Sequence, residues 1–301
     1  MASGLSEKSK SIFSYIGLFA VAMIWGLAFT AVKASLDYVP PIYLIALRFT
    51  IAAVGMIIIF WPKLKGLNKS NIKHGIILGI ILFLSYLVQT IGCKYTTAGK
   101  NAFLTALYII VVPFVHYIIS RKRPGIKVFI AAVIALTGVG LISLQGDLSI
   151  NMGDVLSILC GILFGIQIAY LDDCVETDDP VILTMFEMAV SGILGWCVAP
   201  FAEGAFPVEA VRTDVVLSVL YLGLMSSLLA NLLQAVFQKY TKPENAALIM
   251  STESLFGALG SFLILGELMS TKTIIGCVLM MAAIVISQVT FKSEERHDGS
   301  I

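Results

Sequence analysis

The chain carries two copies of one apolar pattern. Residues 94–96 and 239–241 have the same sequence, Lys-Tyr-Thr, and a glutamine lies five positions before each of them, at Gln89 and Gln234. An offset of 139 residues also aligns Trp25-Gly26 with Phe164-Gly165. Each copy is about five membrane spans long. Because an odd number of spans places the two copies in opposite orientations, the repeat has the layout of many secondary transporters.

Ten stretches of the chain are long and apolar enough, or nearly so, to cross a bilayer, which takes about 20 residues. Only 13% of the residues are charged, against roughly 25% in soluble domains. Long continuous runs favour helices over the short alternating strands of a membrane barrel. We therefore predict an all-α membrane protein with ten transmembrane helices in a 5+5 inverted-topology repeat. The stretches cover residues 12–33, 42–61, 74–93, 102–120, 127–145, 153–171, 181–201, 214–237, 246–265 and 273–291.

The segments between the stretches predict the orientation. With the N-terminus in the cytoplasm, cytoplasmic segments hold 14 Lys and Arg residues and outer segments hold 5. Because basic residues are retained inside, both termini are expected in the cytoplasm, with the protein in the plasma (inner) membrane. The expected parts are a cytoplasmic tail at 1–11, repeats at 12–146 and 147–291, and a second cytoplasmic tail at 292–301.

Composition argues against several function classes. A net charge of +1 does not favour a nucleic-acid partner. The five cysteines are scattered, with no Cys-x-x-Cys pair, so we expect no metal site and no cofactor. The chain has no Gly-x-x-x-x-Gly-Lys-Ser/Thr phosphate loop, which disfavours an ATP-driven transporter. The first apolar run exceeds the roughly 7–15 residues of a signal-peptide core, so we expect a retained span.

Polar residues inside the apolar stretches are the main functional signal, because polar groups are costly at membrane depth. In the third and eighth stretches they follow helical spacing and form one face on each helix. One interpretation is a polar central pocket. The alternative is interhelical hydrogen bonding that only holds the bundle together, at about 0.6 kcal/mol per bond. The residues are Ser85 and Gln89, then Ser227, Asn231, Gln234 and Gln238, with Asn101, Thr105 and Tyr108 in the fourth stretch.

Aromatic and ionisable residues extend the hypothesis. Trp25, Phe29 and Tyr86, with Tyr108, are candidates to line the pocket; lipid contact or core packing is the alternative. Arg48, Glu187 and Glu253 are ionisable residues well inside apolar stretches.

For the two glutamates, proton coupling and structural pairing are both open. Arg48 has substrate contact and structural pairing as alternatives. Inversion puts Arg48 in the outer half of the membrane and its repeat equivalent Glu187 in the inner half, so they should not pair. Lys33 and its equivalent Asp172 follow the same rule.

These motifs together resemble the EamA type of the drug/metabolite transporter superfamily. The matching features are Trp25-Gly26 with Lys33, Leu47-Arg48-Phe49, Gln89-x-x-Gly92-x-x-Tyr95-Thr96-Thr97-Ala98, Pro113, Gln238-Lys239-Tyr240, Ala246-Ala247, Glu253 and Gly266-Glu267. The resemblance covers nearly the whole chain. It implies a ten-helix inverted repeat around a central substrate cavity, and secondary transport of small metabolites, often export of amino acids or related compounds.

The preferred hypothesis is a secondary transporter that exports a small metabolite, an amino acid or related compound, by alternating access. Its predicted partners are that solute and the lipid bilayer, with protons as a coupling alternative and the oligomeric state left open. The competing hypothesis is a membrane-embedded enzyme or scaffold acting on lipid or a partner protein. The chain's scarcity of histidine, three residues, opposes an enzyme. The predicted substrate-binding residues are Trp25, Tyr86, Gln89, Tyr108, Asn231, Gln234 and Glu253, and the candidates for charge or proton coupling are Arg48, Glu187 and Glu253.

Overall fold

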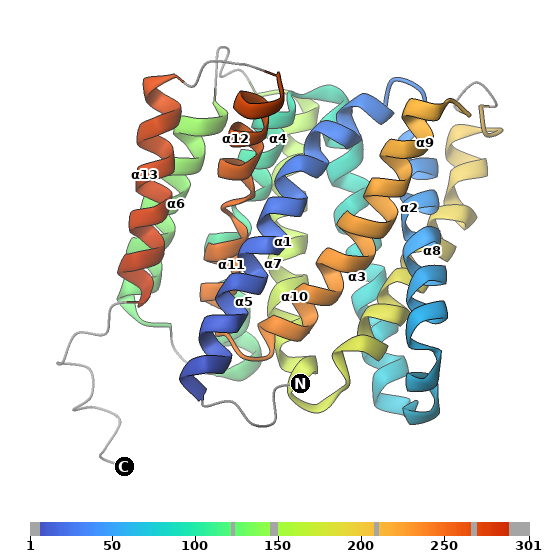
Figure 1. Ribbon diagram of the computed structural model, residues 1–301, viewed down its shortest axis with the longest axis horizontal. Coiled ribbons are helices and arrows are strands. Elements are labelled where there is room, and N and C mark those ends of the chain that lie inside the picture. The colour runs from blue at the N-terminus through green and yellow to red at the C-terminus, as the bar shows by residue number, and fades with distance from the viewer. Residues whose placement is uncertain (1–6, 122–123, 145–149, 208–210, 266–269, 289–301) are drawn as a thin grey trace.

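A computed structural model describes residues 7–121, 124–144, 150–207, 211–265 and 270–288, and every regular element within these ranges is a helix (Figure 1). The elements of the first half are α1 (Glu7–Ser35), α2 (Pro41–Phe60), the 3-10 helix η1 (Trp61–Gly66), α3 (Lys69–Tyr95), α4 (Ala98–Thr105), α5 (Tyr108–Ser120) and α6 (Ile126–Ser143). The predicted boundary between the repeats at 146 and 147, the tail at 292–301 and Gly266-Glu267 lie outside the described residues.

The second half repeats this order of helices. Its elements are α7 (Met152–Thr177), α8 (Pro180–Glu203), α9 (Thr213–Leu220), the π-helix η3 (Tyr221–Leu229), α10 (Ala230–Gln238), α11 (Pro243–Met250), α12 (Glu253–Leu265) and α13 (Thr271–Gln288). α9, η3 and α10 form one continuous helical segment, which occupies the place that α3 has in the first half.

Eight helical segments within the described residues are long and apolar enough to cross a membrane. They are Ser11–Ser35, Pro41–Gly66, Lys69–Tyr95, Gly99–Ser120, Ile126–Ser143, Met152–Thr177, Pro180–Glu203 and Thr213–Gln238. The remaining two predicted spans correspond to the interrupted pair α11–α12 and to the shorter apolar helix Thr271–Ser287. The chain is therefore a multi-pass helical membrane protein.

Two of the predicted spans each contain a break between two helices. Each consists of an 8-residue helix followed by a 13-residue helix, α4 with α5 and α11 with α12. At the second break the hydroxyls of Ser251 and Thr252 donate to the carbonyls of Leu248 and Ile249, both at 2.7 Å. Such side-chain bonds compete with the helical backbone pattern. Tyr108 and Glu253 are each the first residue after a break.

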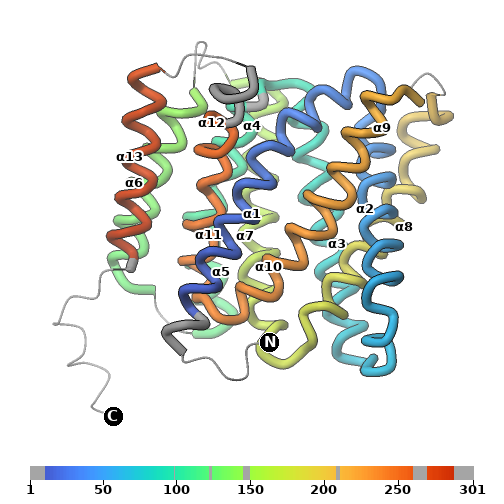
Figure 2. The backbone as a smooth tube through the Cα atoms, viewed as in Figure 1, coloured from blue at the N-terminus to red at the C-terminus, as the bar shows by residue number. Residues whose placement is uncertain are grey.

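The contacts between helices keep the same pattern when the two halves are exchanged. α3 packs against α7, and α10 packs against α1. α5 packs against α7, and α12 packs against α1. The pairs α2–α8 and α6–α13 each join equivalent helices, and α6–α13 forms one edge of the bundle (Figure 2). The first helix of each copy, α1 in the first and α7 in the second, thereby meets the opposite copy near the centre.

The beginning of α1 and the end of α13 lie at the same end of the bundle (Figure 1). We call this end the terminal side and the other end the distal side. α7 runs antiparallel to α3, and hydrogen bonds join the two helices near both ends. On the distal side Asp154 accepts hydrogen bonds from Thr96 and Lys100, both at 2.7 Å. On the terminal side Asp178 accepts one from Asn71 at 2.8 Å.

The two aligned aromatic-glycine pairs have the same packing role. A Cβ atom on Gly26 would lie 2.4 Å from the Glu253 carbonyl oxygen, so only glycine lets α12 approach α1 this closely. A Cβ atom on Gly165 would lie 2.5 Å from Val111 on α5. Small residues permit such backbone contact where lipid offers no hydrophobic drive for helix association. The neighbouring aromatic residues Trp25 and Phe164 both line the central cavity.

The edge pair α6–α13 provides a test of this close packing. A Cβ atom on Gly276 would lie 2.5 Å from the Gly138 carbonyl oxygen. We expect Gly276→Leu to separate the helices and to cost about 1–3 kcal/mol, a fall of about 5 °C in melting temperature. Gly125→Leu is the control, because nothing lies within 4 Å of its Cβ position. Equal melting curves for the two variants would show that α6 and α13 separate without cost.

Candidate functional site

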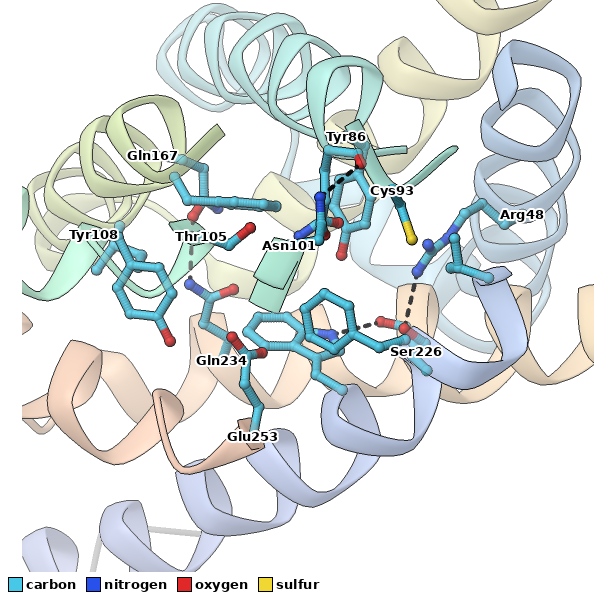
Figure 3. Close-up of a pocket in the computed structure, with 17 residues that line it drawn as sticks. Arg48, Tyr86, Cys93, Asn101, Thr105, Tyr108, Gln167, Ser226, Gln234 and Glu253 are labelled. Atoms are coloured by element: carbon cyan, nitrogen blue, oxygen red, sulfur yellow. Dashed lines mark hydrogen bonds between the residues drawn. The ribbon is translucent and has the colours of Figure 1, made fainter. Parts of the chain in front are cut away.

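A cavity opens between the two halves of the bundle, with side chains from both halves on its walls (Figure 3). Six of the seven residues predicted to bind substrate line it, and so does Arg48. Asn231 and Glu187 do not line it. The six are Trp25 on α1, Tyr86 and Gln89 on α3, Tyr108 at the start of α5, Gln234 on α10 and Glu253 at the start of α12.

Arg48 enters the cavity from α2 as a buried cation. Its Nε donates to the Ser227 hydroxyl at 2.8 Å, and its Nη2 donates to the Ser226 hydroxyl at 2.9 Å. The guanidinium lies over the Tyr86 ring, 4.6 Å from its centroid. Within the described residues no carboxylate pairs with Arg48, although the side chain is only 2% exposed. A guanidinium has five N–H donors, so Arg48 retains donors for an anion.

The serines that hold Arg48 belong to the π-helix η3. Trp25 Nε1 donates to the Ser226 carbonyl oxygen at 3.0 Å. Asn231 Nδ2 donates to the carbonyl oxygens of Ser226 and Ser227 at 3.2 and 2.8 Å. Asn231 thus stabilises the segment that positions Arg48 and does not face the cavity itself. Short π-helical segments are frequent at functional sites.

Glu253 and Tyr108 lie away from Arg48 on the other side of the cavity (Figure 3). The Glu253 side chain is 4% exposed, and within the described residues its carboxylate has no hydrogen-bond or ion-pair partner. The Tyr108 hydroxyl is buried without a partner in the same part of the chain. Buried polar groups are nearly always hydrogen-bonded. Two such groups at one place are therefore suited to a ligand.

A chain of amides leads from the cavity to Glu187. Gln167 lines the cavity from α7 and donates from Nε2 to Glu187 Oε1 at 2.8 Å. Gln234 donates to Gln167 Oε1 at 3.4 Å. Glu187 is 1% exposed and does not contact Arg48. Its place in the structure is behind the cavity wall, where it orients the Gln167 amide.

Aromatic rings form the apolar walls of the site. Tyr86 packs edge-on against Phe49 and Phe164, with ring centroids 5.0 and 5.3 Å apart. Trp25 and Phe29 approach from α1. These rings narrow the space between Arg48 and Glu253. They offer an apolar body of a solute both packing area and the faces that attract cations.

Several cavity residues were not among the predicted site residues, notably Gln167, Ser226 and Phe164. A signal for Gln167 was present, because it is a polar residue in an apolar stretch. Its repeat counterpart is Ala28, so matching the two copies by identity passed over it. Ser226 precedes the predicted polar face by one residue, and only the π-helical turn brings its hydroxyl to Arg48. Within the described residues no group of three His, Cys, Asp or Glu could hold a metal ion.

Comparison with known proteins decides the family. Residues 12–144 and 151–288 each match the EamA-like transporter family. The chain belongs to the EamA-like transporter family. An uncharacterized transporter of Archaeoglobus fulgidus is 33% identical over 94% of this chain and 88% of its own length. The uncharacterized transporter YoaV of Bacillus subtilis is 22% identical over 92% of this chain and 97% of its own length.

A solved structure has the same fold as this chain. One crystal structure superposes on this chain with a TM-score of 0.74, covering 95% of this chain and 99% of the other, at 16% sequence identity. At this identity the likeness concerns the fold alone. The family match and the relatives, which are named as transporters, identify this EamA protein as a membrane transporter.

Proposed function

We propose that this EamA protein is a secondary transporter that exports an amino acid or a related zwitterion by alternating access. The observation that carries the proposal is the pair of charged side chains in one cavity, Arg48 and Glu253, neither of which has an ionic partner among the described residues. A zwitterion supplies the anion and the cation that these two groups lack.

The proposed architecture is ten spans in a 5+5 inverted repeat, with repeats at 12–146 and 147–291. The broken pair α11–α12 would be the ninth span and α13 the tenth. Three observations support it. The halves have matching element order, the helix contacts keep their pattern when the halves are exchanged, and each half has a break between an 8-residue and a 13-residue helix. Broken helices near the midplane are typical of substrate sites in inverted-repeat transporters.

The proposed orientation puts the terminal side in the cytoplasm and the distal side outside, in the plasma (inner) membrane. The beginning of α1 and the end of α13 share the terminal side, as an even number of spans requires. The count of 14 against 5 basic residues in the connecting segments favours the same assignment. The cavity extends toward the distal side along α1, where its wall is formed by Ala28, Phe29 and Val32.

In the proposed binding mode the carboxylate of the solute accepts hydrogen bonds from the free donors of Arg48. Its ammonium group lies between the Glu253 carboxylate and the Tyr108 hydroxyl, with Gln89 and Gln234 as further hydrogen-bonding groups. Trp25 and Tyr86 pack against the solute's apolar part. Glu187 acts indirectly by orienting the Gln167 amide. Asn231 acts indirectly by stabilising η3, which positions Arg48. A proton and the solute's ammonium group would compete for Glu253, which couples transport to the pH gradient.

The test measures flux in proteoliposomes with three classes of solute. These are α-amino acids, the amines that lack their carboxylate and the acids that lack their amino group. We expect efflux of the zwitterions from loaded vesicles, accelerated by a pH gradient, with much slower flux of either analogue. Absence of flux and of thermal stabilisation for all three classes would favour an enzyme or a scaffold instead.

A further inference from the structure

The cavity extends along the seam between α1 and α3 and, among the described residues, does not extend along the equivalent seam between α7 and α10. On α1 its wall continues from Trp25 through Ala28 and Phe29 to Val32, toward the distal side. On α7 the wall includes Phe164, Gln167 and Ile168 and then stops, because Leu171 is 1% exposed and does not line the cavity. The repeat offset of 139 residues makes Leu171 the counterpart of Val32. The seam between α7 and α10, which we call the α7 seam, is therefore closed, whereas its equivalent between α1 and α3 is open.

The side-chain amide of Gln238 closes the α7 seam. Gln238 on α10 is fully buried and donates from Nε2 to the Ile168 carbonyl oxygen at 2.6 Å. Its Oε1 accepts from Gln234 Nε2 at 3.3 Å. The Gln238 amide thus joins the end of α10 to Ile168 of α7, which lines the cavity. The residue at this place in the first half is Cys93, whose side chain lines the cavity and makes no such bridge among the described residues.

We propose that the seam between α7 and α10 is a second passage for solute, closed in this structure, and that Gln238 is the residue that latches it. Gln238 is a positioning residue: it holds the seam shut and does not bind solute in the open cavity. The inference rests on the proposed alternating access, to which it adds the route on the terminal side. Opening the passage breaks the hydrogen bond of Gln238 to the Ile168 carbonyl oxygen and exposes Leu171.

The two passages have mouths of opposite charge. Lys33, at the distal mouth, donates from Nζ to the carbonyl oxygens of Cys93 and Thr96 at 2.7 and 3.1 Å. Its repeat counterpart at the terminal mouth is Asp172, which lies beside Gln238 and near Glu244. A basic mouth attracts the anionic end of a zwitterion and an acidic mouth attracts the cationic end. A solute that crosses the protein therefore meets different charges at the two ends of its route.

Two reporter cysteines in a variant without native cysteines test the latch. Phe29→Cys reports on the open cavity and Leu171→Cys on the closed seam. The measured quantity is the rate of labelling by a membrane-impermeant maleimide added to both sides of opened vesicles. Adding Gln238→Ala is expected to slow labelling at Phe29→Cys and to accelerate it at Leu171→Cys. The ratio of the two labelling rates should change by about fivefold, because the closed seam loses the hydrogen bond that crosses it.

The opposite signs of the two changes separate gating from loss of structure, since general loosening would accelerate both reporters. Ser191→Ala is the matched control. It removes another buried bond, from Ser191 Oγ to the Gly79 carbonyl oxygen at 3.0 Å, away from the seam. Unchanged labelling with Gln238→Ala, or acceleration at both reporters, would overturn the proposal. The labelling needs no solute. It therefore tests the role of Gln238 independently of the flux assay, which tests the proposed transport.

Discussion

Arg48→Gln is expected to lower the affinity for a zwitterionic solute by about 100-fold. Loss of one partner from a buried hydrogen-bonded charge pair costs about 2–5 kcal/mol, and each 1.4 kcal/mol is tenfold in affinity. Glutamine retains an amide that can bond one of the η3 serines but carries no charge for the solute's carboxylate. The measurement is thermal stabilisation by each solute class, followed by flux. Affinity for the amine without a carboxylate should be unchanged.

The melting temperature of the solute-free Arg48→Gln variant shows whether Arg48 binds solute or stabilises the fold. A buried cation without an anionic partner is costly to the folded state, so its removal should leave the melting temperature equal or higher. A stabilised protein that no longer transports is the expected outcome where function uses an unfavourable group. A lower melting temperature with normal transport would assign Arg48 to holding η3 in place through Ser226 and Ser227.

Arg212→Gln is the matched control for loss of a guanidinium. Arg212 is 53% exposed and pairs with Asp214, two residues further along the chain. An exposed pair of this kind contributes little to stability. Flux and solute affinity should both equal those of the wild type. A loss of transport in this variant would show that net charge at the surface, and not the cavity cation, controls the flux.

The length of the apolar stretches and their repetition predicted the coarse features of the fold. The helical class and the central position of Gln89 and Gln234 were predicted from those patterns, and the family was predicted from the motifs that resemble it. The breaks in the fourth and ninth spans were not, because Ser251 and Thr252 are compatible with a continuous helix in composition. Serine and threonine can also make such hydroxyl bonds to preceding carbonyls inside a continuous helix, so composition alone does not mark the break.

The candidate site shows the same limit. Trp25-Gly26 was recognised as a motif, but its two roles are visible only in space: the glycine admits α12 and the tryptophan binds η3. Asn231 fitted the polar face by spacing, yet its amide points to the carbonyl oxygens of its own helix. Helical periodicity gives the face of a residue. It does not tell whether a polar side chain turns toward a cavity or back to the backbone.

Glu253→Gln is expected to remove the response of binding to pH and to weaken zwitterion binding by about 10- to 100-fold. A hydrogen bond to a charged group is worth about 1.5–3 kcal/mol, and the glutamine amide offers an ammonium ion only a neutral acceptor. In the wild type, acidification protonates Glu253 and releases the ammonium group, so affinity should fall as the pH is lowered. The amine should lose affinity in the variant, and the acid that lacks an amino group should not.

The complementary losses in the two variants are the strongest test of the binding mode. Arg48→Gln should spare the amine and Glu253→Gln should spare the acid, because each variant removes the partner of only one charge. Glu203→Gln is the control for an acidic residue outside the cavity, since its carboxylate binds the backbone N–H groups of Ile42 and Tyr43 at the start of α2. If Glu253→Gln kept the wild-type pH dependence, the proton and the solute would not share this carboxylate. Coupling would then have to use an acidic residue behind the wall, of which Glu187 is the one bonded to the cavity amide Gln167.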